Sequence, residues 1–235
     1  APETLKLMQK MLSENEIAYL SGERIWKETE YALRTRSPEV FFEILNKCNA
    51  LKIVFPGIEK LCPAQVLYSL DTLKKSAQLS ADSRVRFAAF IHQLTKKLED
   101  SEGTINRIFS RLKLSNKYKS LVKKVHLLSS KYLELMELEG IHLALLLKEL
   151  GASQKNNDIS LVVLACEAIF HGDTIETEYM TKFEYLTEAE TIFSKSTVTV
   201  PSRRKLTGEN YGRAVFQAKV EQLDFWIKKI KENKT

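Results

Sequence analysis

The stretch Asp82–Leu98, DSRVRFAAFIHQLTKKL, decides the fold class, because its apolar residues recur at the spacing of a helix. Segments of the same kind surround it, and the acidic stretch 172–193 is also expected to be helical. These segments are Gln65–Lys75, Thr104–Leu112, Lys117–Leu135, Ile141–Leu150, Ile159–Phe170 and Tyr211–Asn233. We therefore predict an all-α protein.

Signals for other structure are sparse. The 235 residues include only eight Gly and five Pro, which favours helices joined by short connections. Ser196–Val200, STVTV, has the alternation of a strand but is short and stops at Pro201. No fixed repeat period links the helical segments, so a solenoid of sequence repeats is not supported. An extended helical array without such repeats remains as the predicted architecture.

Local signals place helix starts near the N-terminus. Pro2 suits a first helical turn, Ser21 suits an N-cap, and Ser37-Pro38 predicts another start. The segment Ala50–Pro63, ALKIVFPGIEKLCP, is expected to be a turn between helical units. The residues expected to face the core are Leu5, Met8 and Leu12, then Ile25, Trp26 and Leu33, then Phe41, Ile44, Leu45 and Cys48.

Composition restricts the class of protein. No segment approaches the roughly 20 consecutive apolar residues of a membrane span, and the N-terminus lacks the pattern of a signal peptide. We expect a cytoplasmic protein without a membrane partner. The three cysteines, Cys48, Cys62 and Cys166, lie far apart in apolar sequence and are expected to be reduced core residues.

Charge is unevenly distributed along a chain whose formal net charge is +6. Residues 1–94 are near balance, 132–194 are acidic, and 95–131 and 195–235 are both basic. If the fold brings the basic blocks to one face, that face attracts a polyanion by neutralising phosphates and releasing counterions. From charge alone, a merely solvated surface is the better explanation.

Two regions supply the candidate RNA-binding residues. In 116–132 the lysines recur at a seven-residue spacing while Tyr118 and Leu121 can face the core, so a basic ridge is feasible. In 200–219 a basic loop leads to glycines at an expected helix start, where exposed amides attract phosphate. The candidates are Lys117, Lys123, Lys124 and Lys131, then Arg203, Arg204, Lys205, Gly208, Gly212 and Arg213. Phe225 and Trp226 are expected to be packing residues.

A long ordered stretch resembles the neck of the bacterial class II tRNA nucleotidyltransferases, the family of CCA-adding enzymes and poly(A) polymerases. Its centre is SGERIWKE at 21–28, followed by Phe41-Phe42 and the turn from Ala50-Leu51 to Phe55-Pro56. The resemblance continues through Val85–Lys96 and LACEA at 164–168 to the last helix. It implies neck helices at 1–62, a degenerate HD-like helical body at 63–150 and a helical tail at 151–235.

In this family the nucleotide-adding chemistry belongs to an N-terminal head, in which an Asp-x-Asp pair holds two Mg²⁺ ions. The six aspartates of this chain include no such pair. We expect that the chain needs no cofactor of its own and does not add nucleotides alone. The resemblance implies tRNA and, where one is present, the protein's own head as partners.

The HD-like body is expected to be degenerate. HD phosphohydrolases of the family bind a divalent metal through histidines and aspartates, whereas the matching position here is His92-Gln93, and the upstream helix carries Tyr68 near the expected histidine. His126, His142 and His171 are expected to be ordinary histidines. An active phosphohydrolase is disfavoured.

The leading hypothesis is the tRNA-holding C-terminal region of a CCA-adding enzyme. Two alternatives stay open, namely a headless helical scaffold that has lost RNA binding, and the C-terminal part of a poly(A) polymerase. The sequence does not decide which nucleotides the parent adds.

Overall fold

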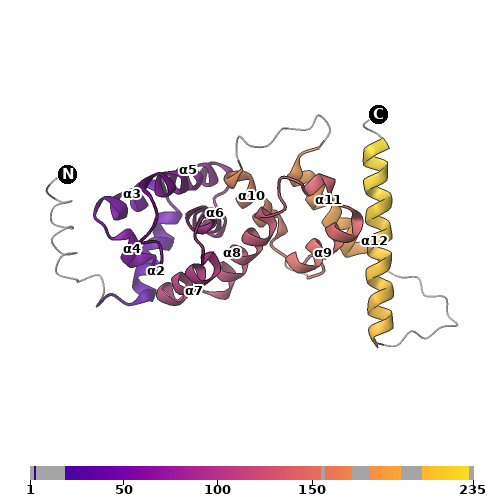
Figure 1. Cartoon of the computed structure of the whole chain (residues 1–235), viewed down its shortest axis with the longest axis horizontal. Coiled ribbons are helices and arrows are strands. Elements are labelled where there is room, and N and C mark those ends of the chain that lie inside the picture. Colours follow the sequence, from indigo (N-terminus) through magenta and orange to yellow (C-terminus); the bar gives the residue numbers. More distant parts are fainter. Residues whose placement is uncertain (1–2, 4–18, 155–156, 171–179, 197–207, 233–235) are drawn as a thin grey trace. The chain divides into compact units, whose positions relative to one another are not determined.

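The computed structural model describes residue 3 and residues 19–154, 157–170, 180–196 and 208–232, and within them it contains helices and no strand (Figure 1). The prediction of an all-α protein is confirmed. The helices are α2 (Gly22–Leu33), α3 (Glu39–Lys47), α4 (Leu51–Val54), α5 (Pro63–Leu79), α6 (Ser83–Thr95), α7 (Ser101–Leu112), α8 (Asn116–Ser129), η2 (Leu135–Glu137), α9 (Gly140–Leu150), α10 (Ile159–Ile169), α11 (Lys182–Lys195) and α12 (Gly208–Glu232).

The chain forms two compact units. Unit 1 comprises residues 1–126 with 164–171, and unit 2 comprises residues 127–163 with 172–235. The division into neck helices, HD-like body and tail, with boundaries at 62 and 150, remains a prediction. None of the described helices combines the length and the apolar character that a membrane span requires.

Helix α6 forms the centre of unit 1. Every residue from Val85 to Thr95 is buried, and α5 makes the most extensive pairing with it. A helix buried on all sides is apolar around most of its circumference, which explains why 85–91 reads VRFAAFI. Phe90 of α6 packs with Phe42 and Phe55, and the ring centroids lie 4.5 to 5.9 Å apart.

A buried arginine joins α6 to α2 and α5 through hydrogen bonds. The guanidinium of Arg86 donates to the carbonyls of Leu33 and Thr35 at 2.7 Å each. It also donates to the carbonyls of Ser80 at 2.7 Å and Ala77 at 3.2 Å. Carbonyls in the last turn of a helix have no partner within that helix, so Arg86 satisfies the C-terminal ends of α2 and α5 together.

Side-chain caps explain where three helices of unit 1 begin. The Ser21 hydroxyl accepts from the Arg24 amide at 3.3 Å, which confirms the predicted start of α2. Asp82 caps α6 and Asp100 caps α7 by accepting from backbone amides at 2.8 and 2.9 Å. Each cap satisfies an amide that has no helical partner.

Several burial predictions need correction. In α3 the fully buried aromatic residue is Phe42, whereas Phe41 and Ile44 are only half-buried. The turn at Ala50–Pro63 contains the short helix α4, and Pro63 begins α5 at a position where proline costs no hydrogen bond. Cys62, the N-cap residue of α5, is exposed and is not the core residue that was predicted. The stripe of Leu5, Met8 and Leu12 lies outside the described residues.

Unit 2 is built around α12, which packs on α9 and α11. Thr181 and Glu184 form a capping box that starts α11, within the acidic stretch expected to be helical. Gly151, with φ of +81°, ends α9 in the left-handed conformation that glycine adopts at low cost. Asp224 of α12 accepts from the Gly140 amide at 2.9 Å and so caps α9 from another helix.

Candidate nucleic-acid interface

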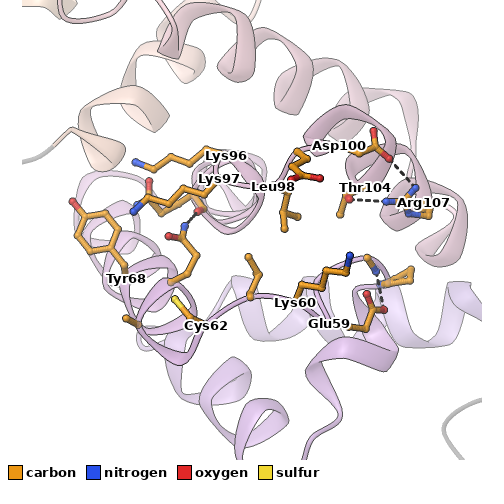
Figure 2. A pocket seen from close by; sticks show the side chains of 17 residues that line it. Glu59, Lys60, Cys62, Tyr68, Lys96, Lys97, Leu98, Asp100, Thr104 and Arg107 are labelled. Carbon is orange, nitrogen blue, oxygen red and sulfur yellow. Dashed lines mark hydrogen bonds and ion pairs between the residues drawn. The ribbon is translucent and has the colours of Figure 1, made fainter.

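A hollow of about 1030 Å³ lies in unit 1 beside α5 and α6 (Figure 2). Its volume matches that of small-molecule sites. The residues around it include Glu59, Lys60, Cys62, Gln65, Tyr68, Gln93, Lys96, Lys97, Leu98, Asp100, Thr104 and Arg107. It therefore contains Tyr68 and Gln93, two of the positions that the sequence assigned to a degenerate HD motif.

Polar atoms at this position are buried without partners. The side chain of Gln93 is fully buried, and neither its amide oxygen nor its amide nitrogen has a hydrogen-bond partner among the described residues. Nδ1 of His92 is also buried and has no hydrogen-bond partner among the described residues. The Gln65 amide instead donates to the backbone carbonyl of Gln93. An unpaired buried amide lowers the stability of the folded chain. The buried side chain of Gln93 therefore destabilises unit 1, which is unfavourable for a region that serves only as a scaffold.

The chemistry of these groups fits a divalent metal ion poorly. Burial, together with nearby His126 and Lys96, lowers the pKa of His92 to about 3, so its imidazole is neutral. The neighbouring donors are an amide and the half-exposed phenol of Tyr68, in place of the carboxylates that hold an HD metal. The described residues contain no group of three or more His, Cys, Asp or Glu side chains arranged to share a metal ion.

Cations outnumber anions around the hollow. Arg107 forms an ion pair with Asp100 at 3.0 Å, and the Lys96 ammonium lies 5.6 Å from the centre of the Tyr68 ring. In the described part of the chain, Lys60 and Lys97 form no ion pair. Neither lysine is among the sequence-predicted candidates, although the Lys96-Lys97 pair lies at the start of the basic block at 95–131.

Helix α8 carries most of the predicted basic ridge. Tyr118 and Leu121 are buried as expected, with the Tyr118 hydroxyl 2.7 Å from that of Ser83. Lys117 and Lys123 are exposed and Lys124 is half-buried. The helix ends at Ser129, so Lys131 lies beyond it and does not continue the helical register. Their contact with RNA remains a prediction.

The second predicted region is described only in part. Arg203, Arg204 and Lys205 lie outside the described residues. Gly208 and Gly212 lie in the first described turns of α12, with open space around both. Arg213 is exposed and forms an ion pair with Glu209 one turn earlier. Exposed pairs of this kind contribute little, so Arg213 remains available to a polyanion.

One aromatic prediction was wrong. Trp226 packs against Tyr185 with ring centroids 4.8 Å apart, as expected of a packing residue. Phe225 instead points outward and is 73% exposed. Adjacent residues on a helix point about 100° apart, and no sequence signal marked which of the two faces α9 and α11.

Comparisons with known proteins identify relatives of this chain. A protein-family model described as "Probable RNA and SrmB- binding site of polymerase A" matches residues 1–62. The chain is 32% identical to a "Multifunctional CCA protein" of Methylococcus capsulatus, over 94% of this chain and 58% of that protein. It is 33% identical to a "Multifunctional CCA protein" of Psychromonas ingrahamii, over 74% of this chain and 48% of that protein. No solved structure matches the chain.

The helical fold and these matches define the class, an all-α region from the RNA-processing nucleotidyltransferases. The chain belongs to the CCA-adding enzyme and poly(A) polymerase family, whose C-terminal region it matches. It spans about half the length of the curated relatives that it matches.

Proposed function

We propose that this chain is the tRNA-binding C-terminal region of a CCA-adding enzyme, holding tRNA while a nucleotidyltransferase head adds nucleotides to the 3′ end. The observation that carries the proposal is the 32% identity with a multifunctional CCA protein over 94% of the chain. In this proposal the chain needs no cofactor of its own, Mg²⁺ acts in the head, and the protein works in the cytoplasm.

Phosphates are the part of tRNA that this surface is suited to bind. Lys117 and Lys123 on α8 are exposed ammonium groups, and each phosphate that they neutralise releases condensed counterions. The deep, narrow major groove of A-form RNA hides the base edges from side chains. We infer that the paired parts of the tRNA are recognised by backbone and shape.

The HD-like position takes no catalytic part in this proposal. Gln93 supplies an amide where a metal-binding carboxylate is needed, and its side chain is fully buried. We expect no phosphatase or cyclic phosphodiesterase activity with Mn²⁺, Co²⁺ or Ni²⁺.

The experiment is a salt titration of tRNA binding to the full chain. Changing Lys117, Lys123 and Lys124 together to Ala should weaken binding and flatten the salt dependence by roughly one unit per lost phosphate contact. A second triple variant, Arg203→Ala with Arg204→Ala and Lys205→Ala, tests the tail in the same way. The matched control changes three exposed lysines outside both basic blocks, Lys47, Lys52 and Lys74, to Ala.

Equal losses in all three variants would mean that only overall charge matters. That result, or tRNA affinity no higher than that of an unrelated basic protein, would contradict the proposal and favour the headless scaffold.

A further inference from the structure

One of the three cysteines is accessible from solution, and it lies at the hollow of unit 1. Cys62 is exposed and lines this hollow, whereas Cys48 and Cys166 are buried. As the N-cap residue of α5, Cys62 forms no capping hydrogen bond with its side chain. Thiol–disulfide exchange requires access to the sulfur atom, so Cys62 is the cysteine of this chain that is placed to react.

Ammonium groups line the hollow around this thiol. Figure 2 shows Cys62 and Lys60 on one side of the hollow and Lys96 and Lys97 on the facing side. All three lysines are exposed. A ligand that carries carboxylates is therefore attracted to the space beside the Cys62 sulfur.

The carboxylates of the lining oppose this attraction only in part. Asp100 forms an ion pair with Arg107 at 3.0 Å, so these two charges offset each other. Glu59 and Glu99 are exposed, and Glu59 accepts from the backbone amide of Gly57 at 3.0 Å. Three lysines against these two carboxylates leave the lining with a small excess of positive charge.

A buried amide in the lining indicates the chemistry of the rest of the ligand. The side chain of Gln93 offers a donor and an acceptor that have no partner among the described residues. A peptide group carries the complementary acceptor and donor, and pairing with it removes the penalty of an unsatisfied buried amide. The volume of the hollow, about 1030 Å³, is sufficient for a short peptide.

We propose that Cys62 is a modification site for a small acidic peptide thiol, which attaches through a mixed disulfide and occupies the hollow. The Cys62 sulfur loses its proton and attacks one sulfur of the peptide disulfide. A new S–S bond joins Cys62 to one peptide, while the old S–S bond breaks and the second peptide leaves as a thiol that carries the proton. The peptide disulfide is itself the oxidant. This inference goes beyond the proposed RNA-binding function and does not depend on it.

The test incubates the full chain with glutathione disulfide, an acidic peptide disulfide, or with uncharged hydroxyethyl disulfide. Intact mass and peptide mapping then identify the modified cysteine. We expect a single glutathione on Cys62, which a reducing agent removes and Cys62→Ser prevents. Lys60→Ala with Lys97→Ala should slow the reaction with glutathione disulfide about fivefold at low salt and leave the rate with hydroxyethyl disulfide unchanged. At about 1 M salt this difference should disappear.

A further variant tests the part assigned to the buried amide. Gln93→Met keeps the approximate size of the side chain and should lower the equilibrium constant for the glutathione mixed disulfide about tenfold, with little effect on the hydroxyethyl one. The matched control, Lys47→Ala with Lys74→Ala, removes two exposed lysines of unit 1 that do not line the hollow. Preferential modification of Cys48 or Cys166, equal effects of the two lysine pairs, or a rate at Cys62 no higher than in the urea-unfolded chain would overturn the inference.

Discussion

The two units differ in the polar groups that their central helices bury. In unit 1 the central helix α6 buries Arg86, His92 and Gln93, so charged and polar groups lie inside the core. In unit 2 the central helix α12 buries Lys219, whose ammonium group donates to the Ser153 hydroxyl at 3.0 Å, and Asp224 of the same helix caps α9.

Within unit 1 the buried polar groups have two different roles. Arg86 satisfies carbonyls of the segments that it joins, whereas the amide of Gln93 has no partner among the described residues and lines the hollow of unit 1. Buried polar groups that stabilise a fold have their hydrogen bonds formed. Buried polar groups without partners are expected at present or former functional sites. Unfolding experiments can measure each role separately.

The two tryptophans make this comparison measurable, because Trp26 lies in unit 1 and Trp226 in unit 2. Replacing either one by Phe leaves a single fluorescent reporter in the other unit.

The largest effect is expected for Arg86→Met. This change leaves buried carbonyls at the ends of α2 and α5 without a donor and should destabilise unit 1 by about 3 kcal/mol or more. Urea unfolding followed by Trp26 fluorescence measures the loss, with Arg84→Met, which removes a partly exposed arginine on the same helix, as the control. An equal loss of stability from both changes would contradict the role of Arg86 in joining α6 to α2 and α5.

A smaller effect is expected from acid. The pKa of His92 is about 3 in the folded chain and 6.5 ordinarily, so the unfolded state takes up the proton first as pH falls. Stability of unit 1 should therefore be complete above pH 6.5 and decline below it, by about 2 kcal/mol at pH 5 from this group. In His92→Leu this part of the pH dependence should vanish, while His142→Gln, which removes an exposed histidine of unit 2, should keep it. Identical pH profiles for the wild type and His92→Leu would refute the assignment.

The smallest effect is expected in unit 2. Asp224→Ala removes the cap on the Gly140 amide and should cost about 1 kcal/mol, as loss of a helix N-cap does. Asp224→Asn keeps an oxygen acceptor and should lose less. Thermal unfolding followed by Trp226 fluorescence compares the stability of the two variants. If Asp224→Asn lowered stability as much as Asp224→Ala, the charge of Asp224 and not its hydrogen bond would be the cause.

Local physics made much of the fold predictable. The apolar spacing of 82–98 predicted α6, and the start of α2 at Ser21 followed from its hydroxyl, because both depend on residues within a few positions. Burial was predicted less well. Phe42 and Phe41 are neighbours of identical chemistry, and only the tertiary packing, which brings Phe42 against Phe55 and Phe90, decides that Phe42 is the buried one.

The candidate interface was also predictable only in part. Basic blocks and the family resemblance were visible in the sequence, since charge and residue order are properties of the chain itself. The ion pair of Glu23 with Lys113 was hidden, because it joins segments 90 positions apart.

The sequence by itself determined that this protein is all-helical, where its principal helices lie and to which family it belongs. Helix formation depends on neighbours three and four positions away, and these are written in the sequence. Only the tertiary structure decided that Arg86 joins the ends of α2 and α5, that the amide of Gln93 is buried without a partner, and that Phe225 points outward. Those outcomes depend on which distant segments meet, and the periodicity of one helix does not specify the helix that packs against it.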